Sequence, residues 1–582
     1  MKKLLVVVLL LASLLTLMGC NQNAQKHEFT GLDDFTYTIG DIKPEWRLGV
    51  EVTDVEDGDI TRSITVDDSA VVWDTPGTYP VIFTSRDRDG NKTSVTVNIT
   101  INLSSEEEFN VYYINDTHGA IEENGNQLGL SAIGNLVMSE KEENPDSTLF
   151  IGGGDILQGN ILSNYYQGAS MIHALNTIGL DAFVLGNHEF DWGLDVVTSY
   201  FDPDSSDLKA TYPLLAANLF RKDTMERPDH VDPYTIIEKG DLKIGVIGLI
   251  GYGLENSIAT ARVSDYMFDE PHVWAAYYAE NLRVNEGVDL VLAVVHDNSS
   301  YTNQQIAQLT GNQKVDAIFN GHSHSRYTQT ISRDGIDVPV IQSKANGEYL
   351  GKVTFTINQG EITSATSTNL HPTQSSTSPS DHITRDSRLA GSNASVNEVI
   401  NEYKLAIQDL LSEVIIYSGN TYGRNDLSYF MAKLIRMSVD ADLGIHNFGG
   451  TRSDLDANEA ITVATLYEIF PFDNKVKYVY LLGSDIKDYA NSGDAISYKD
   501  GLSLELLKDD VYYKVATNDY VFDKVDNPFI YGVDPIDTGL LIRDLLETVL
   551  REQAKTYSSF KTDQPIILTP VSFSITKEED FV

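Results

Sequence analysis

The strongest constraint on this sequence is a regular alternation of short apolar runs with helix-length segments between Phe109 and about Ile362. The runs that we predict to be strands are Val111–Ile114, Leu149–Ile151, Phe183–Leu185, Ile244–Ile250, Leu290–Val295 and Ala317–Phe319. Such alternation is typical of a parallel sheet with helices packed on its faces. With 582 residues the chain is too long for a single core, so this α/β sandwich is expected to be one part of a multidomain protein.

Polar side chains of a metal-binding kind follow these runs at the points where the strands end. They are Asp116, His118, Asp155, Asn187, His296, His322 and His324. The first two and the last two have i, i+2 spacing, which places both members of a pair on one side of an extended chain. Because strand ends meet at one edge of a sheet, we expect all seven side chains to converge there.

The combination of side chains indicates which ion would bind. Carboxylate, imidazole and amide ligands together suit borderline divalent metals such as Mn, Zn, Co or Fe. Two neighbouring ions require a bridging carboxylate, and Asp155, which stands alone after three glycines, is predicted to supply it. Five of the 12 histidines lie in these motifs, the four already named and His188 beside Asn187, a concentration that scattered turn residues would rarely produce. The sequence therefore predicts a centre with two divalent ions.

The motifs, in this order, resemble those of the calcineurin-like metallophosphoesterases. They are most similar to the exported 5′-nucleotidase family, which includes UDP-sugar hydrolases and cyclic-nucleotide phosphodiesterases. The resemblance covers about residues 109–582 and implies a four-layer α/β catalytic domain at residues 109–362. It also implies an extracellular phosphohydrolase that uses two metal ions to activate water and to offset charge on the phosphoryl group.

The same resemblance assigns roles to the motif residues. It implies that Asp116, His118, Asp155 and His324 hold one ion, and that Asp155, Asn187, His296 and His322 hold the other. It further implies that His188, oriented by Asp191, is the catalytic group that is not a ligand and that stabilises charge on the transferring phosphoryl group. Glu189 and Phe190 receive no chemical role.

Residues 395–582 resemble the nucleotidase C-terminal domain, an α/β (α+β) fold that recognises the base and the sugar. Asn447–Arg452 is similar to the family's Asn-x-Gly-Gly-x-Arg loop, so Arg452 is expected to meet the substrate phosphate. The other candidates for substrate binding are Phe472, Asn474, Tyr520, Asp526 and Arg424. Phe472 and Tyr520 are expected to stack on the two faces of the base.

One departure from the family pattern leaves the substrate open. Lys524-Val525 stands where the family has a glycine pair before the acid at Asp526. Nucleoside monophosphates are the expected substrates, with 2′,3′-cyclic nucleotides and UDP-sugars or other nucleotide pyrophosphates as alternatives. A hypothesis of another class is a surface nucleotide-binding or adhesion lipoprotein without activity, although the complete ligand set argues against it.

The segment between the two halves is expected to be flexible. Residues 363–394 form the predicted linker, and they are rich in Ser and Thr with Pro372 and Pro379. A helix is predicted to follow, because apolar residues recur with three-and-four spacing from Val396 to Val414. Ser395 and Glu398 are predicted to form its capping box.

The N-terminal part of the chain indicates export. Residues 1–20 resemble a bacterial lipoprotein signal, with two lysines, a short apolar run and the chain's single cysteine, Cys20. The mature protein is then anchored by lipid on Cys20 to the outer face of the cell membrane. A plain secretory signal with an incidental cysteine is the alternative.

Residues 30–103 have an all-β pattern, with turns such as Asp89-Gly90-Asn91 between alternating strands. The segment resembles the small immunoglobulin-like β-sandwich modules of bacterial surface proteins. We expect a spacer, with binding of sugar, calcium or a cell-surface protein as the alternative, and an acidic linker at Ser104–Glu108. The net charge of −43, from 85 acidic and 42 basic residues, argues against binding to a nucleic acid polymer.

Overall fold

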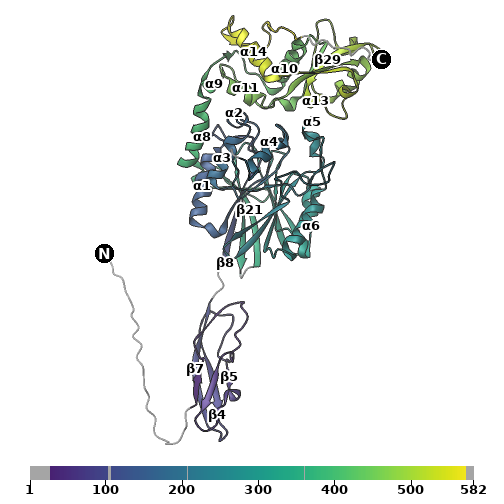
Figure 1. Ribbon diagram of the computed structural model, residues 1–582. Helices are drawn as coiled ribbons and strands as arrows, with labels where there is room; N and C mark the ends of the chain where they lie inside the picture. The colour runs from purple at the N-terminus through teal and green to yellow at the C-terminus, as the bar shows by residue number, and fades with distance from the viewer. Residues whose placement is uncertain (1–26, 103–105, 206–207, 359–360, 572–582) are drawn as a thin grey trace, which may run out of the picture. The chain divides into compact units, whose positions relative to one another are not determined.

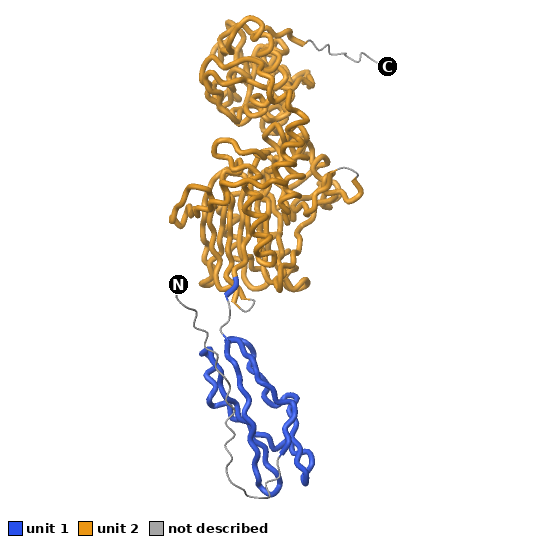
Figure 2. Tube along the Cα trace, turned by 90° about the vertical axis from the view of Figure 1, so that its left-hand side faces the viewer, with its two compact units in different colours: residues 1–107 blue, residues 108–582 orange. Residues whose placement is uncertain are grey.

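The computed structural model describes residues 27–102, 106–205, 208–358 and 361–571, which belong to two compact units (Figure 2). The units comprise residues 1–107 and residues 108–582. The predicted signal segment with Cys20 lies outside the described residues. Within the described ranges, no helix has both the length and the apolar character needed to cross a membrane.

The first unit is built of β-strands in two sheets. One sheet contains β1 (Glu28–Thr30), β3 (Glu51–Asp54) and β4 (Gly58–Asp59). The other has the order β2-β7-β6-β5, with β2 at Phe35–Thr38, β5 at Thr65–Asp67, β6 at Gly77–Arg86 and β7 at Lys92–Asn102. Alternating residues of both sheets, including Val52, Val81 and Phe83, share one buried core. Membership of an immunoglobulin-like family stays a prediction.

Two sheets form the centre of the second unit. The eight-stranded sheet has the order β11-β10-β9-β8-β20-β21-β23-β22. Its strands are β8 (Glu106–Ile114), β9 (Thr148–Gly152), β10 (Ala182–Val184), β11 (Leu214–Leu215), β20 (Leu350–Asn358), β21 (Glu361–His371), β22 (Ser376–Ser378) and β23 (Asp381–Arg385). The six-stranded sheet, β13-β14-β16-β17-β19-β18, contains β13 (Tyr234–Lys239), β14 (Leu242–Ile250), β16 (Leu290–His296), β17 (Ala317–Asn320), β18 (Arg326–Arg333) and β19 (Ile336–Ser343).

Helices cover the outer faces of these sheets and complete four layers, as predicted (Figure 1). Apolar side chains between the sheets, such as Val111, Val246 and Leu292, form one buried cluster. On one outer face lie α1 (Gly129–Glu143) and α3 (Ala169–Ile178), and on the other lie α6 (Pro271–Val284) and α7 (Ser300–Ala307). Five of the six predicted strand segments fall within strands, and the sixth, Phe183–Leu185, extends one residue beyond β10. The central strands β8–β10 and β14–β16–β17 run parallel.

The predicted flexible linker at residues 363–394 is wrong. β21 pairs antiparallel with β20 along its length, and β23 pairs with β21, so this segment extends the catalytic sheet. Threonine favours strands, and Thr363, Ser364 and Thr366 of β21 are exposed while Ile362 and Ala365 pack on the core. Composition alone suggested flexibility and hid this alternation. Similarly, Glu106–Glu108 of the predicted acidic linker already belong to β8.

The predicted long helix is broken into α8 (Ala394–Ala406) and α9 (Gln408–Ser412). The predicted capping box is also wrong, because Asn393 is the N-cap and its side chain accepts a hydrogen bond from the Val396 amide at 3.2 Å. Asparagine is as good an N-cap as serine, and the helix begins two residues earlier than predicted. Val396 and Ile400 of α8 pack against α1 and α3, so this helix joins the two halves of the unit.

The C-terminal half has its own sheets and helices. The five-stranded sheet contains β28 (Ala495–Tyr498), β25 (Leu443–His446), β29 (Tyr512–Asn518), β27 (Lys475–Leu482) and β30 (Val533–Leu541), and the smaller sheet contains β26 (Ala460–Ile461), β24 (Ile416–Ser418) and β31 (Ser559–Phe560). The main helices are α10 (Arg424–Ser438), α11 (Val463–Ile469), α12 (Gly483–Tyr489), α13 (Asp519–Phe522) and α14 (Ile542–Ala554). The loops after β25 and α11 carry Arg452 and Phe472 respectively.

Candidate functional site

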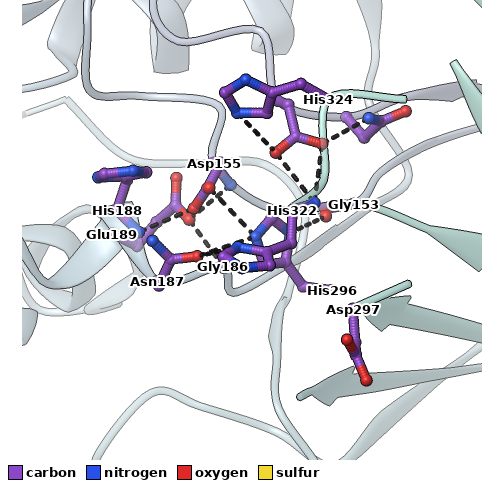
Figure 3. A network of polar contacts seen from close by, with 12 residues as sticks. Gly153, Asp155, Gly186, Asn187, His188, Glu189, His296, Asp297, His322 and His324 are labelled. Atoms are coloured by element: carbon purple, nitrogen blue, oxygen red, sulfur yellow. Dashed lines mark hydrogen bonds and ion pairs between the residues drawn. The ribbon is translucent and has the colours of Figure 1, made fainter. Parts of the chain in front are cut away.

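The seven predicted ligands lie together at the ends of five strands, and Figure 3 shows most of them. Asp116 and His118 follow β8, Asp155 follows β9, Asn187 follows β10, His296 ends β16, and His322 and His324 follow β17. Two groups have ligand atoms within 4.8 Å of one another. One group is Asp116, His118 and His324, and the other is Asp155, His296 and His322.

The first group presents two imidazoles to one carboxylate. The Nε2 atoms of His118 and His324 face each other at 2.9 Å, and Nε2 of His324 lies 3.7 Å from Oδ1 of Asp116. Burial lowers the pKa of His118 well below its usual value, and burial with the charge of Arg452 lowers the pKa of His324 to about 4. Both rings are therefore neutral near pH 7 and offer lone pairs, a donor set that fits a divalent cation.

The second group is linked through Asn187. Oδ1 of Asn187 lies 2.9 Å from Nδ1 of His322 and 3.3 Å from Nε2 of His296, which is 3.1 Å from Oδ2 of Asp155. The other ring nitrogen of His296 is 2.7 Å from the Gly153 carbonyl oxygen. A bound metal ion would displace the proton from Nε2, and Nδ1–H would remain the donor to that carbonyl.

Buried negative charge dominates the electrostatics of the centre. Asp116 and Asp155 are at most 1% exposed. Burial raises the pKa of Asp116 to about 7, and the charge of Asp155 adds to this effect. Burial alone would lower the pKa of His296, but the charge of Asp155 outweighs it and raises that pKa to about 10. Bound divalent cations would offset the same buried charge.

The backbone of the ligand loops adopts rare conformations. Positive φ angles occur at Asp116 (49°), His118 (47°), Asp155 (53°), His322 (72°) and His324 (56°). Residues other than glycine seldom occupy this left-handed region, and such residues concentrate at functional sites where the surroundings fix them. Five of the fourteen described non-glycine residues with positive φ are thus predicted ligands, an observation that does not depend on side-chain chemistry.

Glycines allow the loops to approach one another. A Cβ atom at Gly186 would lie 2.4 Å from Oδ1 of Asp155, and one at Gly154 would lie 2.5 Å from Nδ1 of His296. Either atom would collide with a predicted ligand. Gly186 is therefore required for the packing of the loop that carries Asn187 and His188 against the loop that carries Asp155.

Glu189 has a structural role that the sequence did not reveal. Its carboxylate accepts hydrogen bonds from the amides of Asp155 (2.8 Å), Ile156 (2.9 Å), Leu157 (3.3 Å) and Gly186 (2.8 Å). The residue is fully buried, and burial together with the charge of Asp155 raises its pKa. Glu189 thus joins the β9 loop to the β10 loop. The available signal in the sequence was an acidic residue two positions after the predicted ligand Asn187.

His188 lies beside the ligand groups without belonging to either. Its Nδ1 is 2.8 Å from Oδ2 of Asp191, and its amide donates to Oδ1 of Asp155 at 2.7 Å. Burial lowers the pKa of His188, but the charges of Asp191 and Asp155 outweigh it and raise the pKa above its usual value. Nε2 of His188 remains directed toward Arg452, whose Nη2 is 3.3 Å away.

A cavity of about 350 Å³ opens beside His188 and joins the two halves of the unit. Its walls include Asp155, Asn187, His322, His324 and Arg262 from the catalytic half, and Asn447, Arg452, Phe472, Asn474, Asp519 and Tyr520 from the C-terminal half. The Phe472 ring stacks on the His188 ring at a centroid distance of 5.5 Å and an angle of 23°. Asn474 donates to Oδ1 of Asp519 at 2.9 Å.

Two of the predicted substrate-binding residues lie elsewhere. Arg424 lines a neighbouring cavity of about 310 Å³ together with His118 and Arg452. Asp526 is exposed in the loop after α13 and is not part of the wall of the larger cavity, where the acidic residue beside Tyr520 is Asp519. Asp519 is adjacent to Tyr520 in sequence, so its position could have been considered, but nothing in the sequence favoured it over Asp526.

Comparison with known families also divides the second unit into a catalytic half and a C-terminal half. Residues 109–326 match the family of calcineurin-like phosphoesterases, and residues 412–501 match the 5′-nucleotidase C-terminal domain. A 5′-nucleotidase of Vibrio parahaemolyticus is 25% identical over 442 residues, which cover 67% of this chain and 75% of the relative. A Listeria monocytogenes cell wall protein, Lmo0130, is 25% identical over 559 residues, covering 77% of this chain and 69% of the relative.

Solved structures share the fold. The 5′-nucleotidase precursor of Thermus thermophilus superimposes with a TM-score of 0.63 at 18% identity, covering 77% of this chain and 97% of that one. A Candida albicans 5′-nucleotidase gives a TM-score of 0.58 at 14% identity, covering 77% and 99%. These structures show the fold, and the family matches indicate a metal-dependent phosphoester hydrolase in which a region similar to calcineurin-like phosphoesterases precedes a region similar to the 5′-nucleotidase C-terminal domain.

Proposed function

We propose that the protein releases phosphate from nucleotides, with 5′-nucleoside monophosphates as its substrates. The observation that carries the proposal is the cavity of about 350 Å³, because its walls bring ligand residues, a cation and two aromatic rings together. A nucleoside monophosphate needs these three elements in one cavity. The proposal is supported further by the 5′-nucleotidases among the chain's relatives.

We assign two divalent ions to the ligand groups, with Mn, Zn, Co and Fe as candidates. Asp116, His118, Asp155 and His324 would hold one ion, and Asp155, Asn187, His296 and His322 would hold the other. When bound, such ions supply Lewis-acid stabilisation of phosphate oxygens and lower the pKa of the attacking water.

Around the phosphate, the protein's own side chains would handle charge. His188 has a raised pKa and an Nε2 atom that faces the cavity, so its imidazolium would donate to a phosphate oxygen as negative charge spreads there. Asp191 holds the opposite nitrogen and fixes the ring. Arg452 reaches the same point from the other domain and would bind a second phosphate oxygen through its planar guanidinium group.

The base would lie between Phe472 and Tyr520, which both line the cavity. Stacking on an aromatic side chain contributes about 1–3 kcal/mol per contact and tolerates any base. Asn474 and Asp519 offer polar atoms beside these rings, and we assign the ribose hydroxyls to Asp519 in preference to Asp526.

The two alternatives with the same chemistry are a 2′,3′-cyclic-nucleotide phosphodiesterase and a UDP-sugar or nucleotide pyrophosphatase. Arg262 favours the second of them, because it provides a cation on the cavity wall that a monophosphate does not need. A nucleotide-binding surface protein without activity would keep the cavity but release no phosphate.

A substrate panel tests the proposal. Hydrolysis of AMP, 2′,3′-cyclic AMP, UDP-glucose and glucose 6-phosphate is followed by chromatography of all products, each with Mn²⁺, Zn²⁺ or chelator, because opening of the cyclic ester or cleavage of the pyrophosphate releases no free phosphate. We expect the highest kcat/KM with AMP, and loss of activity with chelator. Preference for UDP-glucose or cyclic AMP would select an alternative, and a metal-loaded protein inactive on the entire panel would overturn the proposal.

The organisation of the chain is part of the proposal. We assign residues 1–20 to a lipoprotein signal, residues 30–103 to an immunoglobulin-like spacer, residues 109–362 to catalysis and residues 395–582 to substrate binding. Export is supported by the relative named as a cell wall protein. If lipid on Cys20 anchors the protein, Cys20→Ala expressed in a Gram-positive host will release it into the medium, whereas retention would exclude the anchor.

A further inference from the structure

We propose that the N-terminal β-unit contains a divalent cation site of its own, formed by His27, Asp54 and Asp87. The three residues come from separate segments: His27 precedes β1, Asp54 ends β3, and Asp87 follows β6. One ligand atom from each lies within 4.8 Å of the other two. The site is independent of the catalytic centre, because all three residues belong to the first compact unit.

Burial and missing partners point to a ligand at this place. His27 is 4% exposed and Asp54 is 6% exposed. Nε2 of His27 and Oδ2 of Asp54 have no hydrogen-bond partner, and among the described residues of this unit they are the buried side-chain atoms with that property. Leaving such atoms unpaired costs about 1–3 kcal/mol each, and more for a charged group. A cation between them would satisfy both.

Hydrogen bonds hold the other polar atom of the His27 and Asp54 side chains, Nδ1 and Oδ1 respectively. The atoms without partners, Nε2 of His27 and Oδ2 of Asp54, are thereby left available to a ligand. Nδ1 of His27 lies 2.5 Å from Oγ of Ser85, and Oδ1 of Asp54 accepts from the amides of Glu56 and Asp57 at 2.8 Å each. With Nδ1–H donating to Ser85, Nε2 is the nitrogen that has a lone pair. This arrangement resembles the outer hydrogen bonds that orient ligands in metal sites.

Asp87 completes the set. Asn91 donates to both of its oxygens, from the amide at 2.7 Å and from Nδ2 at 2.7 Å. Oδ2 of Asp87 lies 3.7 Å from Nε2 of His27, beyond hydrogen-bond reach. Two ligands bound to one zinc ion at about 2.1 Å in tetrahedral geometry lie about 3.4 Å apart. The observed separation therefore matches two ligands of a common ion better than a direct hydrogen bond.

The donor set selects the class of cation. One imidazole and two carboxylates suit Zn²⁺ or Mn²⁺, whereas Ca²⁺ and Mg²⁺ prefer oxygen ligands alone. The carboxylates of buried Asp54 and partly buried Asp87 lie close to one point, so positive charge between them would be stabilising. Such an ion would tie the start of the described chain to the β3–β4 turn and to the β6–β7 hairpin, and so stabilise the unit.

Metal content of the full-length protein tests the site. The protein is stripped with chelator, reloaded with ZnCl₂, separated from free zinc and analysed by mass spectrometry of the metal. We expect His27→Ala and Asp54→Asn each to bind one zinc equivalent fewer than the wild type, with kcat on AMP unchanged. Asp54→Asn preserves the Oδ1 acceptor and the shape of the side chain. His230→Ala, at an exposed histidine outside both sites, serves as the matched control and should lose no zinc.

Hydrogen exchange of the wild type gives a readout that does not depend on any variant folding. Zinc added to the stripped protein should slow amide exchange in residues 51–61 and 84–92 in addition to the catalytic loops. His27→Ala should lose the first effect and retain the second. The proposal would be overturned by equal zinc content in the wild type and both variants, or by unchanged exchange in residues 51–61 and 84–92. Either result would show that His27 forms only an ion pair with Asp87. Failure of the proposed nucleotidase activity would affect neither measurement.

Discussion

The catalytic half and the C-terminal half contribute to the same cavity, but they hold their side chains in different ways. Asp116, Asp155 and His296 are buried at strand ends and fixed by backbone hydrogen bonds or by left-handed conformations. Arg452 is exposed and Phe472 is partly exposed, and both lie on loops. The side chains for catalysis thus lie at the strand ends that carry Asp116, Asp155 and His296, which we call the rigid edge. The side chains for substrate recognition lie on surface loops that can vary without disturbing this edge.

This contrast predicts different effects of substitution in the two halves. Changes at the rigid edge should reduce activity on every phosphate ester to the same degree. Changes in the loops should alter preference among esters. The following predictions begin with the largest effect that we expect.

Asp155→Ala should produce the largest loss. Asp155 is the carboxylate that we place between the two ions, so its removal should lower kcat by about 10⁴-fold on AMP and on p-nitrophenyl phosphate alike. Steady-state kinetics and metal analysis of the purified variant check this, with Asp223→Ala at an exposed position as the control. Full activity of Asp155→Ala would refute the metal assignment.

Asp191→Asn should reduce kcat by about 10³-fold and change its pH dependence. The charge of Asp191 is one cause of the raised pKa of His188, so the imidazolium persists to higher pH in the wild type than in the variant. Activity that needs the imidazolium falls as pH rises through this pKa. The alkaline limb of the pH profile should therefore move to lower pH by about one unit in Asp191→Asn. Exposed Asp195→Asn is the control, and an unmoved limb would exclude this role of Asp191.

Glu189→Gln tests whether the rigid edge depends on a residue that touches no phosphate. The amide would place N–H donors against backbone N–H groups that now face a carboxylate. We expect metal affinity to fall about 10–100-fold, with kcat restored at saturating metal. Metal titrations of activity measure this, and Glu142→Gln on α1 provides an exposed control. An unchanged metal affinity would show that the loops are held by other contacts.

The smallest predicted effect concerns the loop that carries Arg452. His446, at the end of β25, is fully buried, and burial lowers its pKa to about 3. The unfolded chain binds a proton at this residue below its usual pKa of about 6.5 and the folded chain does not, so stability is lost as pH falls from about 6.5 toward 3. Between pH 7 and pH 5 the loss should be about 2 kcal/mol.

Urea unfolding at these two pH values, compared between the wild type and His446→Gln, isolates the contribution of His446. His446 lies within hydrogen-bond distance of Thr451 and Asn518, which are near the Arg452 loop. An identical pH dependence in the variant would contradict the prediction.

The same contrast explains what could be predicted from the sequence. The strands and the convergence of the ligands followed from apolar periodicity and from motif spacing, because parallel strands bring their ends to one edge. Glu189 was missed because its role depends on backbone amides, which no side-chain motif reports. Residues 363–394 were expected to be flexible because the Ser and Thr content of β21 concealed its pairing with β20. The position of Asp519 on the cavity wall depends on the direct junction of β29 with α13, which the family pattern alone did not fix.

The central claim is that phosphate chemistry belongs to the rigid edge and nucleotide selection to the C-terminal loops. Its most direct test is the ratio of kcat/KM for AMP to that for p-nitrophenyl phosphate in Tyr520→Ala. Loss of one stacking contact should lower kcat/KM for AMP about tenfold or more and leave p-nitrophenyl phosphate within about twofold of the wild type. An equal fall for both esters, or no change for AMP, would contradict this division of roles.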